Sequence, residues 1–387
     1  MNTRSSLLGL LLACALLLSG CSVTRAYDAA LVLADTVAGK APSRLKSVTP
    51  APQRSAITFQ IGGRERAADL YRPGVGQPRA AVVLVPGAVQ HGRNEAAIVA
   101  FANTLTRAGF AVVVPAMAGF ADLGLYAGDV QEVADAFTWL ASQTELSAGG
   151  RVGLVGISYS VGPVVLAALR ADLREQVRFI FGVGGYHDLR RTLLFITTGW
   201  FEHDGRWQAL EPNAYGQLVL ALSARRHLAS AHDRALLQTM VERRLADRQA
   251  GLDDLAAQLS AEGRRVFDLI SNRDRQRFAA LFDALPASMR RELEALDLAH
   301  QELQQLQARL ILVHGKNDTL FPFTESLALA QAVGGARTQL FLIHHVLGHV
   351  DPNVSALLTW RFWRHELPDV WRMARATYLL LAERADV

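Results

Sequence analysis

The chain is 387 residues long, half of its residues are apolar, and its net charge is +4. That length is ample for one large core with an insertion, and the scattered arginines form no basic stripe of the kind that nucleic-acid binding needs. The sequence contains no metal-ligand cluster, P-loop or dinucleotide motif, so we expect no metal and no cofactor.

Residues 1–20 have the pattern of an export signal. Arg4 precedes an apolar stretch at 7–18 that is too short for a comfortable membrane span. The stretch ends at Leu18-Ser19-Gly20-Cys21, which resembles the lipobox of bacterial lipoproteins. This resemblance implies cleavage before Cys21 and attachment of lipid to it. A plain secretory signal followed by a free cysteine is the alternative.

The residue after Cys21 and the cysteine count predict where in the cell the protein is found. Ser22 follows the cysteine, which among bacterial lipoproteins implies the outer membrane, facing the periplasm. The only other cysteine, Cys14, lies in the signal, so the mature chain would contain no disulfide. We therefore expect a cell-envelope protein held at the membrane by an N-terminal lipid. Residues 21–55 are predicted to be the lipidated cysteine and a linker, with a short helix at 27–37.

Apolar runs that alternate with helical segments follow from Ala81 onward. They predict an α/β fold with a mostly parallel sheet and helices on both faces. The predicted strands are Ala81–Val85, Ala111–Val114, Val152–Val155, Arg178–Val183, Arg309–Val313 and Gln339–Ile343.

The run at 152–155 leads into the most informative turn of the sequence. It ends at Gly156-Ile157-Ser158-Tyr159-Ser160, and a helix of small and aliphatic residues is predicted at 161–169. A strand that passes through Gly-x-Ser-x-small into a helix is the context in which a serine becomes a nucleophile. Ser160 stands where that pattern usually has glycine. The alternative is an inert Gly/Ser turn.

Two candidate partners of Ser158 come later in the chain. Asp318 and His349 each stand just past the carboxyl end of a predicted strand. In an open parallel sheet those ends line the binding crevice, so the three side chains are expected to meet there. Asp188 is the alternative acid and His345 the alternative histidine.

The chain here resembles the α/β-hydrolase family, over roughly residues 55–190 and 305–387. The residues that carry the resemblance are Gly156-x-Ser158-x-Ser160, His314-Gly315-x-x-Asp318, Gly348-His349 and the strand that enters Pro86-Gly87-Ala88. The resemblance implies that Ser158 is the nucleophile, that His349 carries its proton and that Asp318 orients His349. The backbone N–H groups of Ala88 and Tyr159 would form the oxyanion hole.

An insertion is predicted at 190–307, between core segments 56–189 and 308–387. Its Leu/Ala/Arg/Glu pattern predicts helices, and the resemblance implies a cap above Ser158; a helical appendage beside the core is the alternative. Its first aromatic residues would line an acyl pocket or form the insertion's own core. These are Phe195, Trp200, Phe201 and Trp207.

The function expected from these features is a serine hydrolase in the envelope that cleaves carboxylic esters of a small-molecule acyl substrate. An exopeptidase, thioesterase or acyltransferase could use the same three side chains, because all form an acyl-enzyme. A non-catalytic envelope lipoprotein that keeps the fold is the remaining alternative. His91 and His187 are further candidates for contact with substrate.

Overall fold

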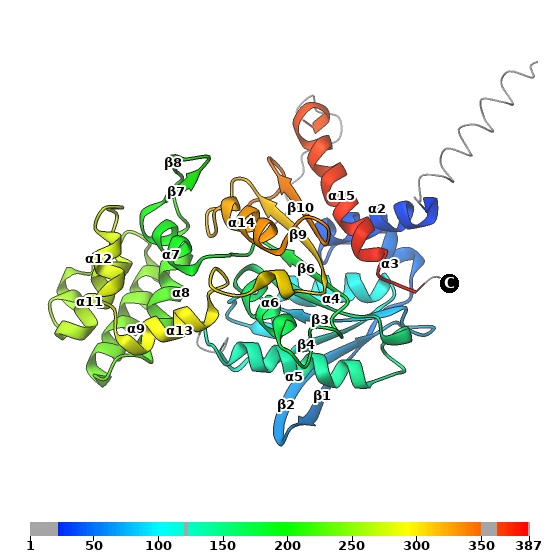
Figure 1. Cartoon of the computed structure of the whole chain (residues 1–387), viewed down its shortest axis with the longest axis horizontal. Coiled ribbons are helices and arrows are strands. Elements are labelled where there is room, and N and C mark those ends of the chain that lie inside the picture. Colours follow the sequence, from blue (N-terminus) through cyan, green and yellow to red (C-terminus); the bar gives the residue numbers. More distant parts are fainter. Residues whose placement is uncertain (1–21, 120–122, 350–361, 386–387) are drawn as a thin grey trace, which may run out of the picture.

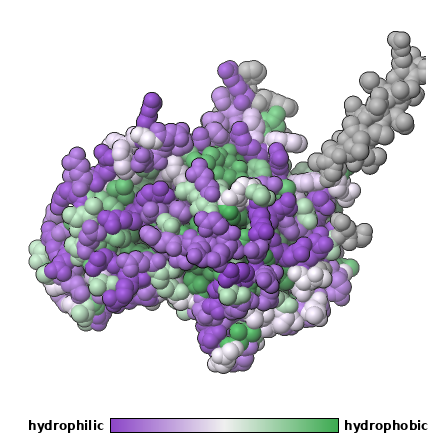
Figure 2. All heavy atoms as spheres, viewed as in Figure 1, coloured by the Kyte–Doolittle hydropathy of each residue, from purple (hydrophilic) through white to green (hydrophobic). Residues whose placement is uncertain are grey.

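The computed structural model describes residues 22–119, 123–349 and 362–385. The predicted signal at 1–20 and the predicted lipid site at Cys21 lie outside the described residues. Within those ranges, no helix combines the length and the apolar character that crossing a membrane requires. Hydrophilic side chains cover most of the face shown in Figure 2.

A sheet of eight strands in the order β1-β2-β4-β3-β5-β6-β9-β10 forms the centre of the protein (Figure 1). Strand β2 is antiparallel to β1 and β4, and every other neighbouring pair is parallel. All six predicted strands are present. The strands are β1 (Gln53–Ile61), β2 (Arg64–Arg72), β3 (Ala80–Val85), β4 (Phe110–Pro115), β5 (Val152–Ile157), β6 (Phe179–Val183), β9 (Arg309–Gly315) and β10 (Thr338–Ile343).

Helices cover both faces of this sheet, as predicted. One apolar cluster joins the sheet to α5 (Asp129–Ser142), α6 (Val161–Leu169) and α14 (Phe323–Val333). A second cluster, on the other face, joins it to α2 (Val23–Ala38), α4 (Ala96–Arg107) and α15 (Leu367–Leu381). The inner strands are buried on both sides, which explains why their sequences are continuous apolar runs.

The short helix predicted at 27–37 is present within α2 (Val23–Ala38), but the rest of the described segment is not the linker that was predicted at 21–55. Helix α2 packs along α15, and α3 (Arg44–Val48) follows it against the core. Asp35 is buried and accepts hydrogen bonds from Ser43, Lys46 and Thr104. These contacts make the segment part of the domain, and β1 begins before residue 56.

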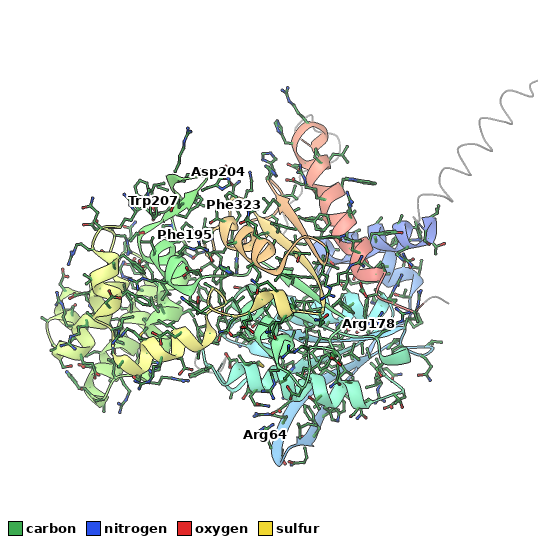
Figure 3. The ribbon with its side chains drawn as sticks, in the orientation of Figure 1. Arg64, Arg178, Phe195, Asp204, Trp207 and Phe323 are labelled. Atoms are coloured by element: carbon green, nitrogen blue, oxygen red, sulfur yellow. The ribbon has the colours of Figure 1, made fainter. Side chains whose placement is uncertain are left out.

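The insertion begins with α7 (Leu189–Thr198) and is mainly helical. Its later helices are α8 (Ala214–Arg225), α9 (Ala231–Ala246), α10 (Asp253–Ala256), α11 (Ala261–Ile270), α12 (Phe278–Asp283) and α13 (Ala287–Leu296). A hairpin of β7 (Trp200–His203) and β8 (Arg206–Ala209), which the helical prediction omitted, projects from it and carries Asp204 and Trp207 (Figure 3).

Candidate active site

Ser158 stands at a sharp turn between β5 and α6. Its φ angle is +58°, a region that residues with a side chain rarely adopt. The turn is tight: a Cβ atom on Gly156 would lie 2.9 Å from the Cα of Val161. Such a strained conformation persists only where the surrounding structure enforces it, and it raises the hydroxyl above the end of the strand.

The loop after β3 is tied to this turn. Ser160 is fully buried, and its hydroxyl donates to the carbonyl of Pro86. This bond accounts for serine at the position where glycine is usual. A Cβ on Gly87 would lie 3.0 Å from the Cβ of Ser158, so glycine allows this close approach without displacing the serine. Ala88 thereby comes to border the same pocket as Ser158.

His349 lies between Ser158 and Asp318. Its Nε2 atom is 2.7 Å from the hydroxyl oxygen of Ser158, and its Nδ1 atom is 2.7 Å from Oδ2 of Asp318. With the proton on Nδ1, the imidazole donates to Asp318 and accepts from Ser158. The three residues, which are far apart in the sequence, therefore form one continuous hydrogen-bonded chain in space, in the order Ser158, His349, Asp318.

Asp318 is held in place from several sides. Its Oδ1 accepts from the backbone N–H groups of Leu320 and Phe321 at 2.7 and 3.0 Å. Its Oδ2 lies 3.2 Å from Nε2 of the buried His314. Burial would raise the pKa of Asp318, but the charge of His349 and hydrogen bonds from both histidines hold it well below its ordinary value. The carboxyl group is therefore ionised.

The alternative residues lie elsewhere. Asp188 caps α7, where it accepts from the backbone N–H of Arg191. His345 is exposed and packs against the ring of His365. His91 is exposed before the short turn that follows Ala88. His187 is half-buried; its backbone N–H donates to Glu325, and burial lowers its pKa.

A cavity of about 50 Å³ opens beside Ser158. Helices α7, α8 and α13 of the insertion contribute to its walls, with Leu193, Ile196, Leu220 and Leu293 among the lining side chains. Tyr159 also borders the cavity. None of the described residues that line it is charged. The insertion thus supplies one side of an apolar pocket next to the serine.

The aromatic residues at the start of the insertion have other surroundings. Phe195 and Phe201 are buried with Phe323 of α14 in a separate cluster, and Figure 3 labels Phe195 and Phe323. Trp207 is 42% exposed and lies under the guanidinium of Arg275. None of them lines the cavity beside Ser158, so Phe195 and Phe201 belong to the packing of the insertion against the core.

Two residues that contact the surroundings of the serine, Tyr215 and Asp129, carry no signal in the sequence. The hydroxyl of Tyr215, on α8, donates to the carbonyl of Ala88 at 2.8 Å and links the insertion to that loop. The hydroxyl of Tyr159 donates to Asp129 at 2.9 Å. Burial raises the pKa of Asp129 to about 7, despite the hydrogen bond from Tyr159.

A mostly parallel sheet with helices on both faces, and a serine on a strained turn after a central strand, define the α/β-hydrolase fold; the chain is a serine hydrolase of this type. More particularly, it belongs to the S15 family: the family model described as X-Pro dipeptidyl-peptidase matches residues 63–350, well over half of the chain. No curated protein matches the chain.

Solved structures with a similar fold include hydrolases of several kinds. The esterase domain of a Rhodothermus marinus protein is 15% identical, with 85% of this chain and 97% of that chain covered and a TM-score of 0.41. Dienelactone hydrolase from Anabaena variabilis is 12% identical, with coverages of 87% and 100% and a TM-score of 0.43. A puromycin-hydrolyzing peptidase of Mycobacterium tuberculosis is 14% identical, with coverages of 89% and 40% and a TM-score of 0.47.

Proposed function

We propose that the protein is a carboxylesterase with Ser158 as its nucleophile. The observation that carries this proposal is the chain of two 2.7 Å contacts from Ser158 through His349 to Asp318. A serine hydroxyl is a weak nucleophile unless a base accepts its proton, and His349 is in reach to do so. Asp318 keeps the other imidazole nitrogen protonated and stabilises the imidazolium that forms.

The reaction proceeds through an acyl-enzyme. The Ser158 oxygen attacks the ester carbonyl while its proton passes to Nε2 of His349, and the N–H groups of Ala88 and Tyr159 stabilise the tetrahedral oxyanion. The C–O bond to the alcohol then breaks, and His349 returns the proton to the departing oxygen. Water, deprotonated by His349, then attacks the acyl carbonyl; the bond to Ser158 breaks, His349 returns the proton to the Ser158 oxygen, and the carboxylic acid is released.

The acyl group that we assign to the pocket is small, apolar and uncharged. A cavity of about 50 Å³ has room for a group the size of about two water molecules, and its lining is mostly aliphatic and aromatic. Esters with acyl chains of about two to four carbons match this space.

A dipeptidyl-peptidase is the second candidate, because the matching family model carries that description. An enzyme that removes dipeptides must hold the free ammonium group of its substrate, and a carboxylate at the pocket is the usual partner for such a charge. The described residues that line the pocket include no carboxylate. Asp129 accepts a hydrogen bond from the hydroxyl of Tyr159, and both residues are buried. We therefore favour neutral esters.

The test compares the two substrate classes on one protein. p-Nitrophenyl acetate, butyrate and octanoate and an alanyl-prolyl p-nitroanilide are assayed with the wild type and with Ser158→Ala. We expect the acetate and butyrate to have the highest kcat/KM and the Ser158→Ala protein to lose turnover of all of them. Faster cleavage of the anilide than of any ester would reject the esterase in favour of the peptidase.

We also propose that lipid on Cys21 anchors the enzyme in the bacterial envelope, at the periplasmic side of the outer membrane. Leu18-Ser19-Gly20-Cys21 supports this, and Ser22 is already tied to the domain by a 3.0 Å hydrogen bond from its N–H to the hydroxyl of Tyr378. An anchor at Cys21 would keep the catalytic domain close to the membrane. Mass spectrometry should find an acylated N-terminal peptide that Cys21→Ser abolishes. An unmodified periplasmic product would contradict the anchor.

A further inference from the structure

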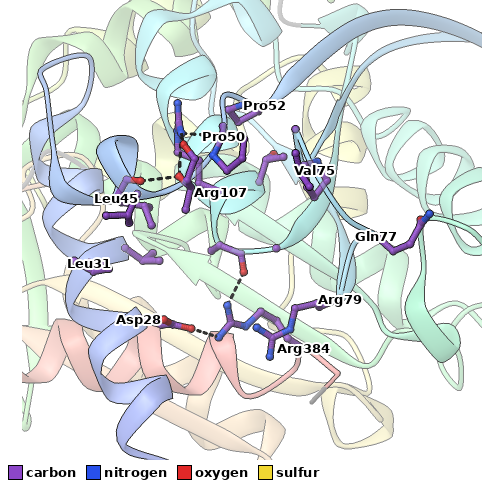
Figure 4. Close-up of a pocket in the computed structure, with 18 of the residues that line it drawn as sticks. Asp28, Leu31, Leu45, Pro50, Pro52, Val75, Gln77, Arg79, Arg107 and Arg384 are labelled. Atoms are coloured by element: carbon purple, nitrogen blue, oxygen red, sulfur yellow. Dashed lines mark hydrogen bonds and ion pairs between the residues drawn. The ribbon is translucent and has the colours of Figure 1, made fainter. Parts of the chain in front are cut away.

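A second, larger cavity, shown in Figure 4, lies at the opposite end of the sheet from Ser158, as the strands that border it show. Arg79 and Gly109, which line it, directly precede β3 and β4, whereas Ser158 follows the carboxyl end of the parallel strand β5. The cavity has a volume of about 400 Å³. Small-molecule sites commonly occupy about 300–1,000 Å³, so it is large enough for a ligand of its own.

Apolar side chains form much of the wall of this cavity. Leu31 and Val32 come from α2, Leu45 and Val48 from α3, and Val75 from the loop before β3. Val48 and Val75 are 46% and 76% exposed. These side chains can cover the hydrocarbon part of a ligand, which would remove them from water.

Positive charge without a counterion is the second feature of the cavity. Arg107 donates from Nη1 to the carbonyl and hydroxyl of Thr49 and to the carbonyl of Pro50. Its Nε is buried and has no hydrogen-bond partner. Within the part of the chain that the structure describes, no carboxylate pairs with this guanidinium.

Two further arginines line the same cavity. Arg384 pairs with Asp28 at 2.9 Å, and no other carboxylate occurs among the described residues that line the cavity. Arg79 donates to the carbonyl of Ala385 and has no carboxylate partner among the described residues. Burial lowers the pKa of Arg384, with a smaller contribution in the same direction from the charge of Arg79. Among the described residues that line the cavity there are thus three guanidinium groups and one carboxylate.

We propose that this cavity binds an amphiphilic anion: a carboxylate or phosphate head joined to an apolar chain. The arginines would bind the head through charge-assisted hydrogen bonds, and α2 and α3 would cover the chain. By volume, the cavity accommodates a chain of about ten carbons with its head. A free fatty acid and a phospholipid both present this chemistry.

The test measures binding on the Ser158→Ala protein, so that its outcome is independent of the proposed esterase activity. Decanoate, decyl phosphate, decanol and inorganic phosphate are titrated by calorimetry. We expect decanoate or decyl phosphate to bind at least tenfold more tightly than decanol and than inorganic phosphate. Preference for decanoate indicates a fatty acid, and preference for decyl phosphate indicates a phospholipid. Equal affinity for decanol, or for inorganic phosphate, would overturn the proposal, as would no binding at all.

Two charge variants locate the site. Arg79→Gln removes a charge whose guanidinium makes a single hydrogen bond, and Gln77→Glu adds a negative charge on an exposed lining residue. Each should weaken binding of the preferred anion at least fivefold. Gln208→Glu, the same change on the exposed strand β8, is the matched control and should leave binding unchanged. Thermal unfolding checks that both variant proteins are folded. Unaltered binding in folded Arg79→Gln and Gln77→Glu would show that the anion binds elsewhere and would reject this site.

Discussion

The conformation of Ser158 is the clearest link between local strain and chemistry in this protein. A non-glycine residue at φ +58° costs on the order of 1–3 kcal/mol. The bond from Ser160 to Pro86 and the close packing at Gly87 stabilise the turn against that cost. This strained conformation directs the hydroxyl of Ser158 toward Nε2 of His349.

The first prediction concerns the nucleophile and its base. Ser158→Ala and His349→Ala should each lower kcat for p-nitrophenyl butyrate by at least about 1,000-fold, because neither residue functions without the other. The double variant should be little worse than either single one. Losses that multiply in the double variant would show that the two residues act independently.

The second prediction concerns the acid. Asp318→Asn should keep the fold but lower kcat by about 10³–10⁴-fold, because the amide favours the wrong tautomer of His349. Asp188→Asn is the matched control and should stay near the wild type. Activity that survives the first change and disappears with the second would transfer the role to Asp188.

The third prediction concerns pH. Burial raises the pKa of Asp129 from 3.8 to about 7, so the folded state holds this proton more tightly than the unfolded chain does. The protonated carboxyl group therefore stabilises the folded state fully below about pH 4, and this stabilisation is lost as the pH rises to about 7. Asp129→Asn can still accept from Tyr159. Between pH 4 and 8 its free energy of unfolding should rise relative to the wild type, by at most about 4 kcal/mol. A difference in urea unfolding that does not change with pH would contradict this.

Ser158, Asp318 and His349 were visible in the sequence because each follows a recognisable strand, and the turn at Ser158 needs small neighbours. Tyr215 and Asp129 gave no such signal. Their partners, Ala88 and Tyr159, belong to other elements, and only tertiary packing brings them together.

At the scale of elements, α2 and α3 show how composition can mislead. The Pro-, Ser- and basic-rich stretch at 41–55 is typical of linkers, yet Asp35 joins it to α4 through Ser43, Lys46 and Thr104. Local composition does not report such a long-range network. The burial of Asp35 therefore could not be predicted from the composition on which the linker prediction was based.

The fourth prediction tests this network. Asp35→Ala should lower the free energy of unfolding by about 2–4 kcal/mol, because it leaves the buried hydroxyl of Thr104 without its acceptor on α2 and removes the partner of Lys46. Lys40→Ala, at an exposed position next to the same segment, should change it by less than about 0.5 kcal/mol. Urea unfolding measures both. A small loss of stability in Asp35→Ala, equal to that in Lys40→Ala, would show that this segment is only a linker.

The fifth prediction concerns the contribution of α7 to the pocket. Leu193→Ala should enlarge the cavity beside Ser158 and shift the preferred p-nitrophenyl ester to a longer acyl chain, at a cost of about 2–5 kcal/mol in stability. Leu237→Ala, on α9 and equally buried but outside the cavity, should cost similar stability without changing the preference. The same chain-length profile in both variants would show that α7 does not limit the acyl group.

For the molecule as a whole, six of the eight strands of the sheet were predictable; the antiparallel strands β1 and β2, and the way in which each helix of the insertion packs, were not. Strands buried on both faces must be continuous apolar runs, so β3, β4, β5, β6 and β9 were readable from residue types alone. The helices of the insertion showed their periodicity, but the face that each one buries depends on contacts such as those of α13 with α6 and α7. The β7–β8 hairpin was missed because two four-residue strands are too short for a period-two pattern.

Covalent capture of the nucleophile tests the central claim most directly. The full-length protein is treated with a fluorophosphonate, which phosphonylates an activated serine, and the adduct is mapped by peptide mass spectrometry. We predict one adduct, on the peptide that contains Ser158, with labelling abolished in Ser158→Ala and strongly slowed in His349→Ala. Absence of any adduct on the folded wild-type protein, or an adduct on another residue that persists in Ser158→Ala, would contradict the account.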